Sequence, residues 1–323
     1  MSYCKTCPVC NGLACGNAIP GPGSKAPGNG AHDNWRAWQD IRINMDVFCA
    51  DAPVDTASEF FGAQLRLPLL TGPIGALTQY SPTDVTVPFN DGVMEACAAF
   101  GAIDTFGDGA VPETFSGGLA SIEKHNACTI PIVNPKSMDV VLEKIERINA
   151  SNALACGVVF DSAGLSHWKN RADRFCTKTP EQLRQLRLAS KKPFVAKGIL
   201  SAKNAVQAVE AGVDAIIVSN HGGRVLPYAP ATADVLPEIV SAAQGKAKII
   251  VDGGIRTGAD IFKALAMGAD AVMICRPIAV SWFGGGAEGV RLYMEKLHAE
   301  LCDTMYMAGA RKLADICPDM IRT

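Results

Sequence analysis

The feature that most constrains this chain is a repeated alternation, starting at Leu67, of a short apolar run and a longer segment of helical period. Glycine, proline, asparagine or aspartate stands at each change between the two. Eight such pairs follow one another. The predicted strands are Leu67–Gly75, Ile103–Asp108, Thr129–Asn134, Cys156–Asp161, Pro193–Gly198, Ala215–Asn220, Lys248–Gly253 and Ala271–Arg276. The predicted helices include Met138–Asn152, Pro180–Ser190, Ala202–Ala211, Ala233–Gln244, Gly258–Met267 and Ala287–Met307.

The apolar character of these strands points to the fold. They are apolar throughout instead of alternating, which indicates a parallel sheet covered on both faces. Eight βα units in roughly 255 residues predict a closed (β/α)8 TIM barrel. An open doubly wound sheet is the alternative, but no G-x-G-x-x-G follows any predicted strand, so its usual nucleotide signal is missing.

The first 62 residues do not follow the repeat. They are rich in glycine and proline up to Asp33, followed by a predicted helix at Trp35–Ile43 and a short apolar stretch at Met45–Cys49. We therefore divide the chain into an N-terminal extension, residues 1–62, packed on a barrel formed by residues 63–323.

Charge and composition indicate which classes of binding partner to expect. A formal net charge of −2 over 323 residues offers no electrostatic reason to expect nucleic acid or an acidic membrane, so a small molecule is the expected partner. No apolar run reaches the length of a membrane span, and the first residues lack the apolar core of a secretory signal. Eight of the twelve cysteines lie in apolar segments, as small core residues do in a reducing compartment. We expect a cytoplasmic protein.

Polar residues at the ends of barrel strands are the candidate functional residues, because active sites of such barrels lie at the carboxyl ends of the strands. On the predicted strands these residues are Asp161, Lys197, Asn220-His221-Gly222-Gly223-Arg224, Asp252-Gly253-Gly254-Ile255-Arg256 and Cys275-Arg276.

The glycine-rich turn at Asp252–Arg256, with Arg276 beside it, is typical of a phosphate site, because backbone N–H groups and a cation face the ligand. The alternative is an ordinary tight turn with a helix cap at Thr257. Lys197 ends a buried strand, where a charged side chain is costly without a partner. Its candidate roles are a Schiff-base former, a phosphate ligand or a cation opposite developing negative charge. A lysine reaching the barrel mouth without a chemical role is the alternative.

His221 is the candidate general base, since imidazole takes up a proton near neutral pH. Asp161 would orient it, and Arg224 offers a bidentate fork to a carboxylate. A structural histidine is the alternative.

Four further cysteines are clustered. Cys4, Cys7, Cys10 and Cys15 are separated by two, two and four residues. Thiolates at this density favour an iron–sulfur cluster such as [4Fe-4S] or a structural zinc ion, with simple thiol packing as the alternative.

Three stretches together carry a resemblance to a known family: "PFVAKGILSAKNAVQAVEAGVDAIIVSNHGGR", "APATADVLPEIV" and "IIVDGGIRTGADIFKALAMGADAVMICRPI". They resemble the FMN-dependent α-hydroxy-acid oxidase and dehydrogenase family, which includes glycolate oxidase, lactate oxidase and mandelate dehydrogenase. The match is continuous from about Lys191 to Pro277 and weaker before Asp161. It extends to the C-terminus, where "HAELCDTMYMAGARKLADI" looks like the family's closing helices.

The resemblance implies an FMN in the barrel mouth. By similarity, Lys197 lies near the flavin N1 and O2, and Ser219 lies on the strand that passes the flavin. Cys275 stands at a flavin-binding position where the family commonly has glycine. The phosphate-binding positions are Asp252, Gly253, Gly254, Arg256 and Arg276, and "LTGPIG" places Pro73, Ile74 and Gly75 against the isoalloxazine ring.

The same resemblance implies the activity, an oxidoreductase of the EC 1.1 type. His221 falls on the base, Asp161 on its acidic partner, and Arg224 on the substrate-carboxylate clamp. The reaction would oxidise a 2-hydroxy acid, lactate-like, glycolate-like or larger, to the 2-oxo acid. The base takes a proton while two electrons pass to the flavin, either as a hydride or by way of a carbanion. The electron acceptor would be a protein, a quinone or oxygen. Many family members are tetramers, which makes a homo-tetramer the expected assembly.

Several family positions are not kept. Trp168 stands where a second carboxylate-binding arginine is usual, with His167 and Lys169 beside it, and Val133 replaces a tyrosine. Trp168 and Tyr80 are therefore our candidates for substrate contact, and Tyr228 could also supply a phenol. These losses leave open a flavin-dependent reductase, or an isomerase like type 2 isopentenyl diphosphate isomerase, on a different substrate. A non-catalytic flavin or metal sensor is a third reading.

Overall fold

The computed structural model describes residues 25, 28–75, 77, 81, 83–109, 111–165 and 172–323. Within them, eight parallel strands form one sheet in the order β4-β11-β10-β9-β8-β7-β6-β5. Thr71 N donates to Ile103 O at 3.0 Å and Ile103 N to Leu69 O at 3.2 Å, so the sheet closes between β4 and β5. The strands are β4 Leu69–Thr71, β5 Asp104–Gly107, β6 Thr129–Val133, β7 Cys156–Val159, β8 Phe194–Ile199, β9 Ala215–Val218, β10 Lys248–Val251 and β11 Ala271–Ile274.

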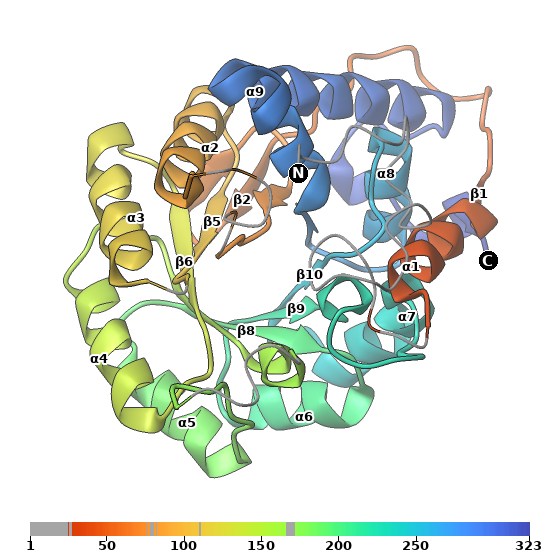
Figure 1. Cartoon of the computed structure of the whole chain (residues 1–323). Coiled ribbons are helices and arrows are strands. Elements are labelled where there is room, and N and C mark those ends of the chain that lie inside the picture. The colour runs from red at the N-terminus through yellow and green to blue at the C-terminus, as the bar shows by residue number, and fades with distance from the viewer. Residues whose placement is uncertain are drawn as a thin grey trace.

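Helices surround these strands on the outside (Figure 1), and the predicted (β/α)8 barrel is confirmed. Two helix starts have capping boxes, with Thr179 paired to Gln182 and Thr257 paired to Asp260. The helices of the repeat are α2 Thr86–Phe100, α3 Pro112–His125, α4 Met138–Asn149, α5 Pro180–Ala189, α6 Ala202–Glu210, α7 Thr232–Ala243, α8 Gly258–Ala266 and α9 Arg276–Met307.

The last helix differs from its prediction. We predicted a helix from Ala287, whereas α9 begins directly after β11 at Arg276. Gly285 and Gly286 depart from helical geometry and divide α9, with Gly286 at φ 61°. The prediction began too late because glycines are unfavourable inside helices, although helical geometry continues on both sides of these two.

Two layers of buried side chains hold the barrel together. One lies between the sheet and the helices, and the other fills the barrel interior. A hairpin of β2, Ser58–Phe60, and β3, Ala63–Leu65, packs Phe60 and Leu65 onto that interior. Their neighbours there include Ala215 and Ala271, which begin β9 and β11, so the hairpin covers the end where the strands start. The hairpin also straddles residue 62, and the division of the chain at that residue stays a prediction.

The N-terminal region adds one helix beside the barrel. This helix, α1 Gly30–Asp40, lies next to α7 and α8 (Figure 1). Our prediction of Trp35–Ile43 started too late and ended too late, because Ile41 is extended and the next two residues form a strand. That strand, β1 Arg42–Ile43, pairs antiparallel with β12 Ile321–Arg322 at the other end of the chain. The apolar stretch after it lies at the surface, with Phe48 98% exposed. Among the described residues, none of the helices combines the length and apolar character that crossing a bilayer requires.

Candidate active site

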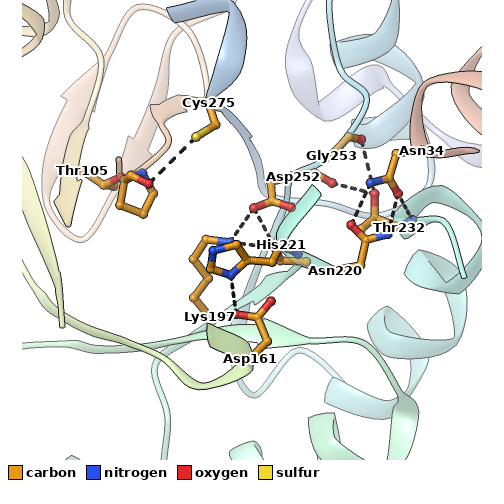
Figure 2. Close-up of polar contacts among 12 residues, drawn as sticks. Asn34, Thr105, Asp161, Lys197, Asn220, His221, Thr232, Asp252, Gly253 and Cys275 are labelled. Carbon is orange, nitrogen blue, oxygen red and sulfur yellow. Dashed lines mark hydrogen bonds and ion pairs between the residues drawn. The ribbon is translucent and has the colours of Figure 1, made fainter. Parts of the chain in front are cut away.

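Side chains from three neighbouring strands meet in a buried ion pair at the carboxyl end of the barrel. Lys197 of β8 donates from Nζ to Asp252 Oδ2 at 2.6 Å and to Ser219 Oγ at 2.7 Å (Figure 2). Ser219 Oγ also donates to Asp252 Oδ2 at 2.8 Å. Burial lowers the pKa of Lys197, but the charges of Asp252 and Asp161 outweigh it and raise that pKa above its ordinary value. A lysine held charged is a poor nucleophile, which favours the role of a cation over that of a Schiff-base former.

A histidine–carboxylate pair lies beside this ion pair. His221 Nδ1 is 2.9 Å from Asp161 Oδ1 (Figure 2). Burial raises the pKa of Asp161, but His221, through its charge and its hydrogen bond, and the charge of Lys197 outweigh burial and hold that pKa below its ordinary value. An ionised carboxylate can only accept, so Nδ1 carries the hydrogen and Nε2 is the basic nitrogen of the neutral ring. The pair therefore has the form of a general base with its orienting group.

The backbone that carries His221 is unusual. His221, Gly222 and Gly223 all have left-handed conformations, with φ of 56°, 64° and 79°. Ser219 Oγ accepts from His221 N at 3.1 Å. A Cβ on Gly222 would collide with the guanidinium of Arg276, whose Nη2 donates to Gly222 O at 2.8 Å. A Cβ on Gly223 would collide with the backbone of Gly30 and Ala31. Both glycines are thus required by the left-handed turn, Gly222 also by the close approach of Arg276 and Gly223 by that of α1.

The turn after β10 is also built on two left-handed glycines. Gly253 and Gly254 each have φ of 86°, and a Cβ on Gly254 would collide with the backbone of Asn34. The turn then enters α8, capped by Thr257. A buried acceptor points to a ligand here: Asp252 Oδ1 has no hydrogen-bond partner among the described residues. A group that brings hydroxyl donors and a phosphate anion, as FMN does, fits this turn together with the guanidinium of Arg276.

The predicted flavin contacts on the far side of the mouth also come together. Cys275 Sγ lies 3.9 Å from Pro73 O, and a Cβ on Gly72 would collide with Cys275. Burial is the largest influence on the pKa of the Cys275 thiol and raises it, while Lys197, Arg276 and Arg224 act in the opposite direction. The thiol is therefore protonated and lies among the charged groups of the site. Gly75 packs on the backbone of Gly109, so the loop Pro73–Gly75 borders the same mouth.

The remaining predicted residues lie outside the described residues, on the two turns or at the surface. Trp168, Tyr80, Cys4, Cys7, Cys10 and Cys15 lie outside the described residues. Arg224 ends the left-handed turn, and Arg256 lies on the turn after β10, where its Nη1 donates to Ile255 O at 2.7 Å. Tyr228 is 79% exposed. Among the described residues, no group of three or more histidine, cysteine, aspartate or glutamate side chains is arranged to hold a metal ion.

Two sets of residues at the mouth were not predicted from the sequence. Asn34 of α1 and Thr232 of α7 are buried against the His221 and Asp252 turns, and no pattern in the N-terminal region indicated this. Buried Asp108 contacts the partly buried Asn134 and Lys144 where β5 and β6 end. Asp108 follows an apolar strand just as Asp161 does, so the rule of strand ends could have found it.

Fold and site together define a (β/α)8 barrel whose mouth combines a histidine–carboxylate pair with a glycine-rich turn that leads into a helix. The chain belongs to the FMN-dependent dehydrogenase family, whose sequence profile matches residues 23–175 and 166–323. This confirms the family resemblance that the sequence motifs indicated.

Individual relatives agree with this family. The chain is 47% identical over 138 residues to a peroxisomal (S)-2-hydroxyacid oxidase of Arabidopsis thaliana, and 49% identical over 138 residues to an L-lactate oxidase of Nostoc. Each of these alignments covers 43% of this chain and 38% of the relative, so the match spans well under half of either protein. Among solved structures, a mandelate oxidase with a monooxide FMN adduct is similar over 93% of both chains, with a TM-score of 0.79 and 27% identity.

Proposed function

We propose that this protein is an FMN-dependent oxidoreductase that oxidises a 2-hydroxy acid to the corresponding 2-oxo acid. The observation that carries the proposal is the His221–Asp161 pair beside the Lys197–Asp252 ion pair, on adjoining strand ends. The position of these two pairs at one barrel mouth, together with the turn at Gly253 and Gly254, supports a base and a cation acting on one bound molecule. The names of the relatives, which are oxidases of 2-hydroxy acids, support the same chemistry. No observation favours a reductase or an isomerase over it.

Each residue has a proposed task. FMN, when bound, supplies a two-electron acceptor. We assign its phosphate to the turn of Asp252, Gly253, Gly254 and Arg256 together with Arg276, and its ring to the region of Pro73, Ile74, Gly75, Ser219 and Cys275. Lys197 would hold a positive charge against the ring.

The substrate would bind at the barrel mouth next to His221 and the FMN ring. His221 Nε2 accepts the substrate proton, and Asp161 stabilises the imidazolium that results. Arg224 binds the substrate carboxylate, and charge-assisted hydrogen bonds of this kind contribute about 1.5–3 kcal/mol. We retain Trp168 and Tyr80 as candidate substrate contacts on sequence grounds alone.

Anaerobic mixing of the FMN-loaded protein with a panel of 2-hydroxy acids tests the function. We expect at least one acid to bleach the visible flavin absorbance, because its two electrons remain on the flavin when no acceptor is present. Dithionite serves as the control for a reducible flavin. Bleaching by dithionite and by none of the acids would reject the proposal. Subsequent addition of air, a quinone or candidate acceptor proteins identifies the acceptor.

We further propose that Cys4, Cys7, Cys10 and Cys15 bind an iron–sulfur cluster or a zinc ion. Their spacing supports this. Lys25, which follows the cysteine segment, contacts the loop that carries His221. Lys25 N donates to Gly223 O at 2.7 Å, and Lys25 Nζ donates to Gly164 O at 2.8 Å and Val225 O at 2.9 Å. The ten-residue step from Cys15 to Lys25 spans at most about 36 Å, which bounds the distance of such a centre from Lys25.

Metal analysis of anaerobically prepared protein is expected to find iron with sulfide, or zinc, bound to the full chain. Replacing the four cysteines with serine should remove it. The matched control replaces Cys49 and Cys317, both exposed, and should leave the metal in place. Protein that holds neither metal would contradict the proposal. A cytoplasmic location and a homo-tetramer stay predictions.

A further inference from the structure

A buried pair of amide side chains joins α1 to the turn that carries His221. Asn34 Nδ2 donates to Asn220 Oδ1 at 2.7 Å, and Asn220 Nδ2 donates to Asn34 Oδ1 at 2.8 Å (Figure 2). Each residue is only 1% exposed. Buried amides are costly unless their hydrogen bonds are made, so this reciprocal pairing holds the two segments at one separation and one orientation.

Asn220 spans the loop that bears the proposed base and clamp. Its Oδ1 also accepts from Gly223 N at 3.1 Å, and its Nδ2 donates to Pro230 O at 3.0 Å. His221 and Arg224 both lie between Asn220 and Pro230 in the chain. The Asn220 side chain therefore fixes the start, the turn and the end of this loop, and Asn34 holds that side chain from outside the barrel.

The loop needs such support because His221 has a left-handed backbone, with φ of 56°. This conformation is unfavourable for a residue with a Cβ, and it persists where the surroundings over-determine it. The first residue of α1 adds to the support, since a Cβ on Gly30 would lie 2.9 Å from Gly223 Cα.

Asn34 also reaches the glycine-rich turn after β10. Its Oδ1 accepts from Thr232 N at 3.0 Å, and Thr232 Oγ1 donates to Asp252 O at 2.6 Å. The backbone of Asn34 packs on Gly254. One residue outside the barrel is thus in contact with both the base-bearing loop and the turn that we assign to the FMN phosphate.

We propose that Asn34 is a positioning residue that acts through Asn220 and Thr232 to couple the FMN turn to the placement of His221. This inference rests on the proposed function for the identity of the cofactor and the base. Because binding free energies are reciprocal, FMN binding should order His221, and loss of the link should weaken FMN binding.

Two variants of Asn34 separate the two contacts. Asn34→Ala removes both, whereas Asn34→Asp keeps the acceptor for Thr232 N and places an oxygen opposite Asn220 Oδ1. We expect Asn34→Ala to raise the FMN dissociation constant about tenfold, a typical coupling between two linked sites, because the turn assigned to the phosphate loses its link to the His221 loop. Asn34→Asp should disturb mainly the His221 loop. In the double variant Asn34→Ala/Asn220→Ala the two effects should not add, since either change breaks the same pair.

The second readout is the His221 ring Nδ1–H, observed by NMR in histidine-labelled full-length protein and assigned with a His221→Asn sample. In the wild type, FMN should strengthen this signal, because Nδ1–H is held against Asp161. In both Asn34 variants the response to FMN should be lost. Neither readout requires turnover. If the protein oxidises no 2-hydroxy acid, the proposed function is rejected, but the FMN affinity and the His221 signal still test the role of Asn34.

Two controls separate positioning from general stability. Ile145→Val lowers the melting temperature through the buried face of α4, which lies across the barrel from α1 (Figure 1), and should leave both readouts unchanged. Arg36→Ala removes an exposed ion pair on α1 itself and should also leave them unchanged. Asn34 variants that only melt earlier, with FMN affinity within twofold of wild type and an unaltered His221 signal, would overturn the inference.

Discussion

Replacing His221 with asparagine is expected to lower the rate of flavin reduction by a 2-hydroxy acid by roughly 10²–10⁴-fold, the usual contribution of a general base. Asparagine tolerates the left-handed backbone at this position, with φ of 56°, better than most residues do. Its Nδ2 can donate to Asp161 in place of the His221 Nδ1, but it has no basic nitrogen. The change thus removes the proton acceptor while preserving the turn.

Anaerobic stopped-flow measurement of the bleaching rate checks this prediction, and FMN should remain bound in the variant. His125 provides a matched control. It forms a second histidine–carboxylate pair, with Nε2 2.9 Å from Asp91 Oδ1, between α2 and α3. His125→Asn should reduce the flavin at the wild-type rate. A His221→Asn protein that does the same would show that the base is another group.

Replacing Lys197 with methionine should destabilise the protein by about 3–5 kcal/mol, because it leaves the buried Asp252 carboxylate without its counter-charge. The side chains of Lys197 and Asp252 are 6% and 10% exposed, so solvent compensates little. The pKa of Lys197 is raised in the folded protein, and its stabilisation is therefore complete below the ordinary lysine pKa and lost only as the pH rises through the raised value. The deficit of the variant should persist throughout the neutral range.

Denaturant unfolding of the FMN-free protein measures this loss. In the double variant Lys197→Met/Asp252→Asn much of the stability should return, since neither charge is then left unpaired. Lys248→Met is the exposed control: its pair with Asp270 is 52% and 32% exposed, and its loss should cost less than about 1 kcal/mol. A Lys197→Met protein as stable as the wild type would contradict the assignment of a buried, charged pair.

Much of the site could be predicted from strand ends. Parallel strands in a barrel bring their carboxyl ends to one mouth, so Asp161, Lys197 and Asp252 had to lie near one another once the eight strands were recognised. The contacts Lys197–Asp252 and His221–Asp161 follow from that geometry. The rule works because the apolar runs are local signals, readable without knowledge of the rest of the chain.

Prediction was weakest where distant segments meet. The start of α1, its pairing through Asn34 with Asn220, and the β2–β3 hairpin depend on contacts with the completed barrel. Local sequence around Asn34, rich in glycine and polar residues, favours irregular structure and carries no sign of burial. In this region tertiary packing outweighed local propensity.

By itself, the sequence determined the barrel, the family and the side chains at the mouth, because hydrophobic periodicity and strand ends are properties of short segments. Only the tertiary structure decided how those side chains are charged and held. The pKa of Lys197 depends on burial together with Asp252 and Asp161, and the left-handed turn at His221 is supported by Asn34, 187 residues away in the chain. Such effects arise from the through-space environment of each group, which a linear pattern of residues does not contain.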